Sequence, residues 1–133
     1  MTNYNQTPLQ VVAGKYREIA IFSTDGENID PVVVKSFGEE WLKFNDFSDS
    51  AIAEAGDEYF DILSARIINK DSYVLDVGCG TGRWTKFLTK RVGFIEAIDP
   101  SNSIFAADKL LGEIKNVRLT KASTDNIPFE DES

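Results

Sequence analysis

Residues 74–84 read Val-Leu-Asp-Val-Gly-Cys-Gly-Thr-Gly-Arg-Trp, an apolar run that leads into three glycines at alternate positions. The apolar start is typical of a buried parallel strand, which is apolar at nearly every residue. Gly78, Gly80 and Gly82 remove every second side chain, so a ligand can approach bare backbone. Residues 83–91 have helical character, and the free N–H groups at a helix N-terminus favour a negatively charged group. A loop between a parallel strand and a helix is the usual ligand crevice of an open α/β sheet.

The glycine spacing distinguishes this loop from two common nucleotide-binding patterns. A dinucleotide fingerprint, Gly-x-Gly-x-x-Gly, would need a glycine where the chain has Arg83. A phosphate loop of the form Gly-x4-Gly-Lys-Ser/Thr is also absent. What remains is Asp-x-Gly-x-Gly-x-Gly, from Asp76 to Gly82. The alternative is a turn without a ligand, but alternating glycines weaken a turn entropically unless something must approach it closely.

A second apolar stretch, residues 93–99, ends in the carboxylate of Asp99, 23 residues after Asp76. In a βαβ unit, an acidic residue about 20 positions past the glycines reaches the ribose hydroxyls of a bound nucleotide. The alternative is that Asp99 caps the following helix, because aspartate is a good N-cap residue. Ser101 and Asn102 are better placed for that role, so we expect Asp99 to face a ligand.

Three motifs of this chain resemble those of the class I S-adenosylmethionine-dependent methyltransferases. Residues 74–82 resemble the first motif of that superfamily. Asp99-Pro100-Ser101 resembles the second motif, whose acid binds both ribose hydroxyls of the cofactor. Residues 121–129, Lys-Ala-Ser-Thr-Asp-Asn-Ile-Pro-Phe, resemble the family segment Gly-Asp-Ala-x-x-Leu-Pro-Phe. The resemblance implies S-adenosyl-L-methionine as the cofactor.

The resemblance also implies which residues contact that cofactor. Ser123 falls where the family has the acid that contacts the adenine amino group, and serine can accept a hydrogen bond without the charge. Ile104 lies where the family places an apolar residue against the adenine; the alternative is a core residue of its helix. The full set implied is Asp76, Gly78, Cys79, Gly80, Gly82, Asp99, Pro100, Ile104, Ser123 and Thr124.

The chain divides near residue 70 into an N-terminal extension, residues 1–70, and a cofactor-binding portion, residues 71–133. The second portion alternates strand and helix, which indicates a parallel sheet. Helices are expected over residues 83–91 and 102–111, and a third strand over residues 117–120. Right-handed crossovers place the strands in the order 3-2-1. The predicted fold class is therefore α/β, an incomplete Rossmann-like methyltransferase fold with an α-rich N-terminal extension.

The extension has a weaker pattern. Residues 9–22 mix β-branched and charged side chains and predict either two short strands or one irregular segment. Aromatic residues at positions 37, 41 and 44 share one helical face, and residues 49–69 also read as helix. We therefore expect the extension, a cap over the cofactor in some methyltransferases, to be mostly helical.

Composition limits the functions that are open to this chain. A net charge of −8 argues against a nucleic acid partner, because phosphate binding needs clustered Lys and Arg. No apolar stretch approaches the ~20 residues needed to span a membrane, and there is no signal-peptide pattern. A single cysteine, Cys79, suits a reducing cytoplasm, and without any histidine a nucleophilic role for it is not expected. The absence of histidine also removes the commonest metal ligand.

The sequence ends at Ser133, just after the third motif, whereas the family fold continues through four more strands. We therefore expect a piece of a longer enzyme rather than a natural short protein, with its catalytic residues and acceptor pocket elsewhere. The strand at residues 73–77 then needs a hydrogen-bonding partner. The candidates are residues 9–22 of the same chain or the same strand of a second copy, and we favour a homodimer.

Three classes of function follow. The first is an S-adenosylmethionine-dependent methyltransferase, represented by its cofactor-binding part and inactive or nearly so in isolation, with an unidentified methyl acceptor. The alternatives are a nucleotide-binding oxidoreductase domain, disfavoured by Arg83, and a non-catalytic binding or assembly module of the same fold. Fold alone does not decide among them.

Overall fold

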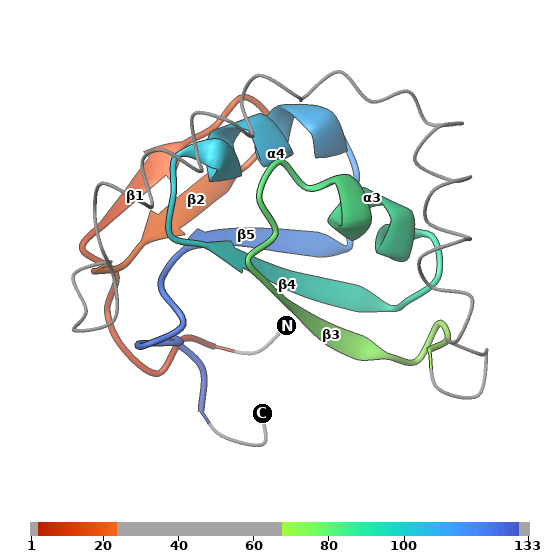
Figure 1. The fold of residues 1–133 in the computed structure, drawn as a ribbon, viewed down its shortest axis with the longest axis horizontal. Helices are drawn as coiled ribbons and strands as arrows, with labels where there is room; N and C mark the ends of the chain where they lie inside the picture. Colours follow the sequence, from red (N-terminus) through yellow and green to blue (C-terminus); the bar gives the residue numbers. More distant parts are fainter. Residues whose placement is uncertain (1–2, 24–67, 131–133) are drawn as a thin grey trace.

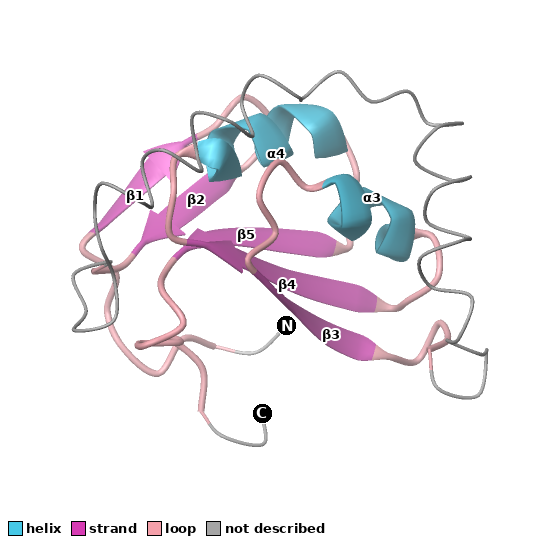
Figure 2. Ribbon diagram, in the orientation of Figure 1, coloured by secondary structure: helices cyan, strands magenta, loops and turns pink. Residues whose placement is uncertain are grey.

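The computed structural model describes residues 3–23 and 68–130, which form a five-stranded sheet with two helices on one face (Figures 1 and 2). The strand order is β1-β2-β5-β4-β3. The elements are β1 (Gln10–Ala13), β2 (Glu18–Ile21), β3 (Tyr73–Val77), α3 (Arg83–Thr89), β4 (Phe94–Asp99), α4 (Ser103–Leu111) and β5 (Val117–Lys121).

The later three strands confirm the predicted parallel order. β3 pairs with β4 in the register Tyr73↔Phe94, and β4 pairs with β5 in the register Ile95↔Val117. α3 and α4 are the two crossover helices, and both lie over the same face of the sheet (Figure 1). α4 ends at Gly112, whose φ of 57° is in the left-handed region that glycine tolerates.

The N-terminal hairpin is the main departure from the expected arrangement. β1 and β2 pair antiparallel, and β2 continues the sheet by pairing in parallel with β5 through Ala20↔Thr120. Of the two open readings of residues 9–22, the two short strands are therefore correct. The proposed pairing of this segment with the strand at residues 73–77 is wrong, because the hairpin lies at the opposite edge of the sheet. The helices expected over residues 31–44 and 49–69 lie, apart from residues 68 and 69, outside the described residues.

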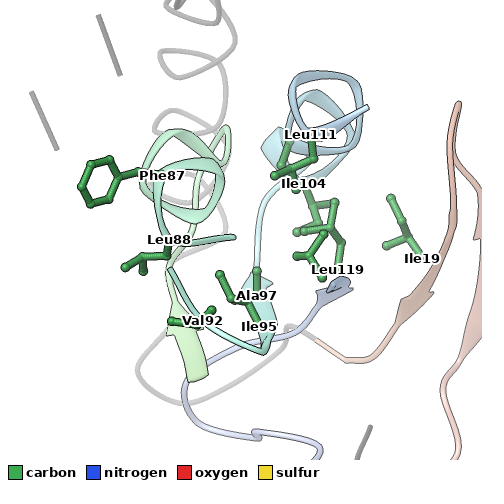
Figure 3. Close-up of a cluster of buried hydrophobic side chains, with 11 residues drawn as sticks. Ile19, Phe87, Leu88, Val92, Ile95, Ala97, Ile104, Leu111 and Leu119 are labelled. Carbon is green, nitrogen blue, oxygen red and sulfur yellow. The ribbon is translucent and has the colours of Figure 1, made fainter. Parts of the chain in front are cut away.

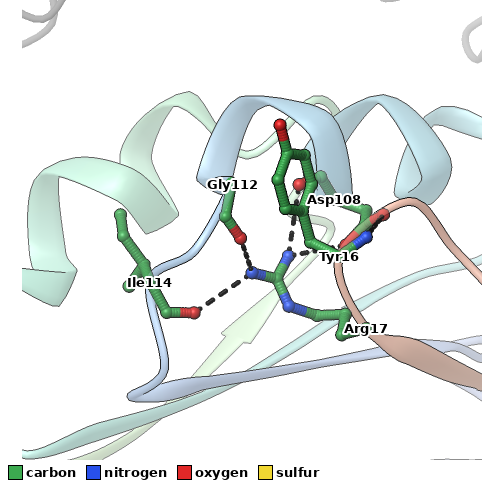
Figure 4. Close-up of polar contacts among 5 residues, drawn as sticks. All are labelled: Tyr16, Arg17, Asp108, Gly112 and Ile114. Carbon is green, nitrogen blue, oxygen red and sulfur yellow. Dashed lines mark hydrogen bonds and ion pairs between the residues drawn. The ribbon is translucent and has the colours of Figure 1, made fainter.

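Arg17 holds the hairpin against the end of α4 (Figure 4). Its guanidinium donates to the Asp108 Oδ1 carboxylate oxygen at 2.9 Å and to the Gly112 carbonyl at 2.6 Å. The hairpin turn can come this close because Gly14 has no side chain: a Cβ there would lie 2.5 Å from Asp108 Oδ2. Burial lowers the pKa of Arg17, and the Asp108 carboxylate opposes that shift.

The main core lies between the helices and the sheet (Figure 3). Its members are apolar side chains from both helices and from β2, β4 and β5, and the most deeply buried are Ile19, Ile95, Ile104, Leu111 and Leu119. A fully buried Leu or Ile contributes about 1.5–3 kcal/mol relative to exposure. This core fixes which face of each strand points toward the helices.

The face of the sheet away from the helices is more exposed than the apolar sequence of β3 predicts. Tyr73, Leu75 and Val77 of β3 are 41%, 43% and 44% exposed. The expectation that this strand is buried on both faces is therefore wrong for the described residues, because both described helices cover the same face. In the middle of the open face, Glu96 is buried, accepts a hydrogen bond from the Tyr73 hydroxyl at 2.6 Å and pairs with Arg118 at 2.7 Å.

The two ends of the described chain meet on this open face. The Asn5 backbone N–H donates to the Pro128 carbonyl at 3.0 Å, and the Tyr4 ring stacks on Phe129. A hollow of about 910 Å³ lies beside them, lined in part by Tyr73 and Glu96. Within residues 3–23 and 68–130, no helix has the length and apolar character to cross a membrane.

Candidate functional site

The candidate site lies at the C-terminal ends of the parallel strands β3, β4 and β5. The glycine loop, residues 78–82, leaves β3 and passes over the end of β4. There the backbone N–H groups of Gly78 and Cys79 both donate to the Ile98 carbonyl, at 2.8 Å and 3.0 Å. β5 reaches the same place, because the Ala122 N–H donates to the Asp99 carbonyl at 3.2 Å. Three segments that are distant in sequence therefore meet at one edge, as the motifs predict.

The three glycines of the loop are required by their backbone conformation. Gly78, Gly80 and Gly82 have φ angles of 74°, 56° and 84°, all in the region that residues with a Cβ rarely adopt. Their surroundings differ, however. A Cβ on Gly78 would meet nothing within 4 Å, whereas a Cβ on Gly82 would lie 3.1 Å from the Ala107 Cβ of α4. Gly78 thus borders open space, and Gly82 serves close packing of the loop on α4.

Asp99 connects the loop to the start of α4. Its Oδ2 accepts the Gly80 N–H at 2.9 Å. Its Oδ1 accepts the Ser101 N–H at 2.8 Å, the Ser101 hydroxyl at 2.6 Å and the Ser103 hydroxyl at 3.3 Å. The side chain is 8% exposed. The Oδ1 oxygen therefore orders the turn that leads into α4, although Asp99 is not the N-cap residue considered as the alternative. The Oδ2 oxygen accepts a single bond from the described residues and retains capacity for another.

The N-cap of α4 differs from expectation. Asn102 occupies the N-cap position but makes no side-chain capping bond, and its Oδ1 instead accepts from the Lys121 ammonium at 2.9 Å. The Ser101 hydroxyl contacts the Ser103 N–H at 3.3 Å and the Ser103 hydroxyl at 2.6 Å. The Ser101 hydroxyl oxygen therefore accepts the first N–H of α4, whereas Asp99 contacts the start of the helix through the two serine hydroxyls.

Asp76 lies behind the loop, at the end of β3. Its Oδ2 accepts the Thr85 hydroxyl of α3 at 2.5 Å, which joins the strand before the loop to the helix after it. Burial raises the pKa of Asp76 from its ordinary value; the Thr85 hydrogen bond opposes the shift and the Asp99 charge adds to it. The half-buried Asp76 of β3 and the buried Asp99 of β4 thus place two carboxylates at neighbouring strand ends.

Cys79 lies within the loop as a packing residue. Burial raises the pKa of its thiol well above the ordinary value, and the Asp99 and Asp76 charges act in the same direction. The thiol therefore stays protonated, which agrees with the expectation that it is not a nucleophile. The hydroxyl of Thr81, which we had not included among the site residues, is buried and has no hydrogen-bond partner within the described residues. Its position between Gly80 and Gly82 is the feature of the sequence from which Thr81 could have been predicted as a site residue.

The remaining predicted residues are placed unequally. Ser123 follows β5 at the same sheet edge and is buried, and Thr124 beside it is exposed. Pro100 is half-buried next to Asp99. Ile104 is fully buried in the main core, so the structure favours the core role that we had considered as the alternative to an adenine contact.

The three parallel strands β3, β4 and β5 carry a bare glycine loop and a buried carboxylate at their carboxyl ends. This arrangement is typical of α/β domains that bind nucleotide cofactors. Residues 74–133 match the model of a methyltransferase domain. The chain is 37% identical over 70 residues to the demethylmenaquinone methyltransferase of Staphylococcus aureus, covering 50% of this chain and 29% of that enzyme. The crystal structure of the YcgJ protein from Bacillus subtilis has a TM-score of 0.53 at 20% identity, covering 60% of this chain and 34% of that one.

Residues 74–133 are therefore similar to a methyltransferase domain, in agreement with the three motifs that resemble those of the class I S-adenosylmethionine-dependent methyltransferases. The likeness to the Bacillus protein concerns the fold alone. The chain spans less than a third of the length of the Staphylococcus relative.

The raised pKa of Asp76 predicts a specific pH dependence of stability. Because the folded protein binds this proton more tightly than the unfolded chain, the free energy of unfolding falls as the pH rises from 3.8 through the raised pKa. Asp76→Asn keeps an oxygen that accepts the Thr85 hydroxyl but has no ionisation. We expect wild type to lose stability relative to this variant across that pH interval, measured by urea unfolding. A constant difference at all pH values would contradict it.

Proposed function

We propose that this chain provides the cofactor-binding part of an S-adenosylmethionine-dependent methyltransferase. The observation that carries the proposal is the buried Asp99 carboxylate, hydrogen-bonded to the Gly80 N–H beside a loop that lacks side chains. This arrangement supports a role for Asp99 as an acceptor of ribose hydroxyls, beside a wall of bare backbone. The match of residues 74–133 to the model of a methyltransferase domain supports the same cofactor.

Two features of the loop fit such a group. A Cβ on Gly78 would point into open space, with no atom within 4 Å, so a ligand can approach the loop backbone there. The Thr81 hydroxyl, buried and without a partner among the described residues, is a polar atom that a bound ligand or water would satisfy. Both observations favour a ligand over an unoccupied turn.

The chain's own residues would bind and orient the cofactor. Gly78 and Gly80 would form the wall at its amino-acid end, and Asp76 would order that wall through Thr85. Asp99 Oδ2 would accept from the ribose, and Ser123 would lie near the adenine. When bound, the cofactor supplies an electrophilic methyl group on a positive sulfonium, and the protein supplies orientation.

The alternatives give different binding results. An oxidoreductase domain would bind NADH, and a non-catalytic module would bind neither ligand productively. Calorimetric titration with S-adenosylhomocysteine and with NADH separates these classes, and we expect binding of the first alone. The single cysteine, Cys79, supports a reducing compartment, and a cytoplasmic location is part of this proposal.

The glycine loop gives the first test. Gly78→Ala introduces a Cβ into the open space and should weaken binding of S-adenosylhomocysteine by at least about tenfold, that is about 1.4 kcal/mol. Urea unfolding of both proteins is the control, because the left-handed φ of 74° at Gly78 strains any residue with a Cβ, and the loss of affinity must exceed what a loss of folded protein explains. Unchanged affinity in a folded Gly78→Ala variant would remove the loop from the site.

Asp99 gives the second test. A hydrogen bond to a charged group contributes roughly 1.5–3 kcal/mol, so Asp99→Ala should weaken cofactor binding by at least about tenfold. Asp71→Ala is the matched control, because it removes an exposed carboxylate just before β3, at the strand end opposite the glycine loop, so its affinity should stay near wild type. A change of less than twofold in Asp99→Ala would leave the carboxylate with its turn-forming role only.

The homodimer is also retained as a proposal. β3 is the last strand of the described sheet, and its Leu75 and Val77 side chains are exposed. An apolar edge strand favours pairing with another strand, and the hairpin has been placed elsewhere. Light scattering at micromolar concentration should report a dimer, with slow hydrogen exchange at residues 73–77. A monomer with fast exchange there would refute the dimer.

A further inference from the structure

The N-terminal hairpin contacts α4 through a concentrated set of polar bonds. Arg17 donates to four acceptors near the end of that helix: Asp108 Oδ1 at 2.9 Å and the carbonyls of Asp108, Gly112 and Ile114 at 3.3, 2.6 and 3.1 Å. Asp108 is 1% exposed, and its second oxygen accepts the Tyr16 N–H at 3.0 Å. The guanidinium therefore satisfies both a buried carboxylate and carbonyls that a helix end leaves open (Figure 4).

The same helix contacts the glycine loop at two points. Ala107, the residue before Asp108, lies against Gly82: a Cβ on Gly82 would lie 3.1 Å from the Ala107 Cβ, which is a tight contact. At the start of α4, the Ser103 hydroxyl donates to Asp99, whose other oxygen accepts the Gly80 N–H. A shift of α4 along or about its axis would therefore move both contacts of the loop.

We propose that Arg17 and Asp108 form a positioning pair, through which the N-terminal hairpin sets the place of α4 and thereby of the glycine loop and Asp99. The proposal rests on the proposed function, since it concerns the same cofactor site. Neither residue belongs to the loop, and the hairpin lies outside the family-matched residues 74–133. A segment outside that match would thus tune cofactor affinity without contacting the cofactor.

Arg17→Lys is the informative substitution. It keeps a positive charge beside Asp108, so the buried carboxylate is not left alone, but one ammonium does not span the four acceptors. Val92→Ala is the matched control: Val92 is 1% exposed in the main core, and it lies before β4, at the sheet end opposite the glycine loop. Both variants lose stability, and only the first disturbs α4.

Two readouts are measured on the full chain: calorimetric affinity for S-adenosylhomocysteine and hydrogen exchange of the Gly80 amide, which donates to Asp99. We expect Arg17→Lys to weaken binding about three- to tenfold and to speed Gly80 exchange, and Val92→Ala to do neither. Equal behaviour of the two variants in both readouts would overturn the positioning pair. If wild type binds no S-adenosylhomocysteine but Gly80 exchange still rises only in Arg17→Lys, the proposed function fails and the positioning pair stands.

Discussion

The carboxylate of Asp99 is the interaction on which the carboxyl edge of this sheet depends. One oxygen accepts the Gly80 N–H of the loop. The other accepts the Ser101 N–H and the Ser103 hydroxyl, in the turn that leads into α4. These are bonds between an ionised acceptor and neutral donors inside a buried region, where such bonds are short and strong. Without the carboxylate, several buried donors would lose their acceptor, so strand, loop and helix are fixed together by one side chain.

In the proposed cofactor site, the same residues also have structural roles. Each of the three glycines needs a left-handed backbone, yet Gly82 serves helix packing and Gly78 borders open space. Asp76 similarly connects β3 to α3 through Thr85 while adding negative charge behind the loop. A cofactor would therefore bind to a site whose hydrogen bonds already exist, which lowers the entropy lost on binding.

The two faces of the sheet have different characters. The helix face has a continuous apolar core, with Ile95 and Leu119 at its centre. The other face has the buried Glu96–Arg118 pair, flanked by the exposed Leu75 and by the aromatic contact of Tyr4 with Phe129. A buried ion pair is weak evidence for stability but specifies partners well, so this pair favours the observed alignment of β4 with β5.

Local sequence determined most of the parallel unit. Alternating apolar runs and glycines predicted β3 with its observed ends, and the spacing from Asp76 to Asp99 placed two carboxylates at one sheet edge. These features depend on neighbours within one or two elements, so their signal lies in short windows of sequence. The same reasoning did not decide whether Ile104 packs in the core or contacts the cofactor. Periodicity shows which face of the helix is apolar, but not how deeply a residue on that face is buried.

Tertiary structure alone decided where the hairpin joins the sheet. The sequence suggested only the strand at residues 73–77 as a partner for residues 9–22, whereas the hairpin pairs with β5. There, Arg17 contacts Asp108 across 91 residues of sequence. That contact combines a buried charge pair with the open carbonyls of a helix end, and no local pattern encodes which helix end will be available. The close approach of Gly82 to Ala107 is of the same kind. The sequence by itself thus determined the chemistry of the loop and the order of the parallel strands. The pairing of the hairpin with β5 and of Arg17 with Asp108 followed only from three-dimensional packing.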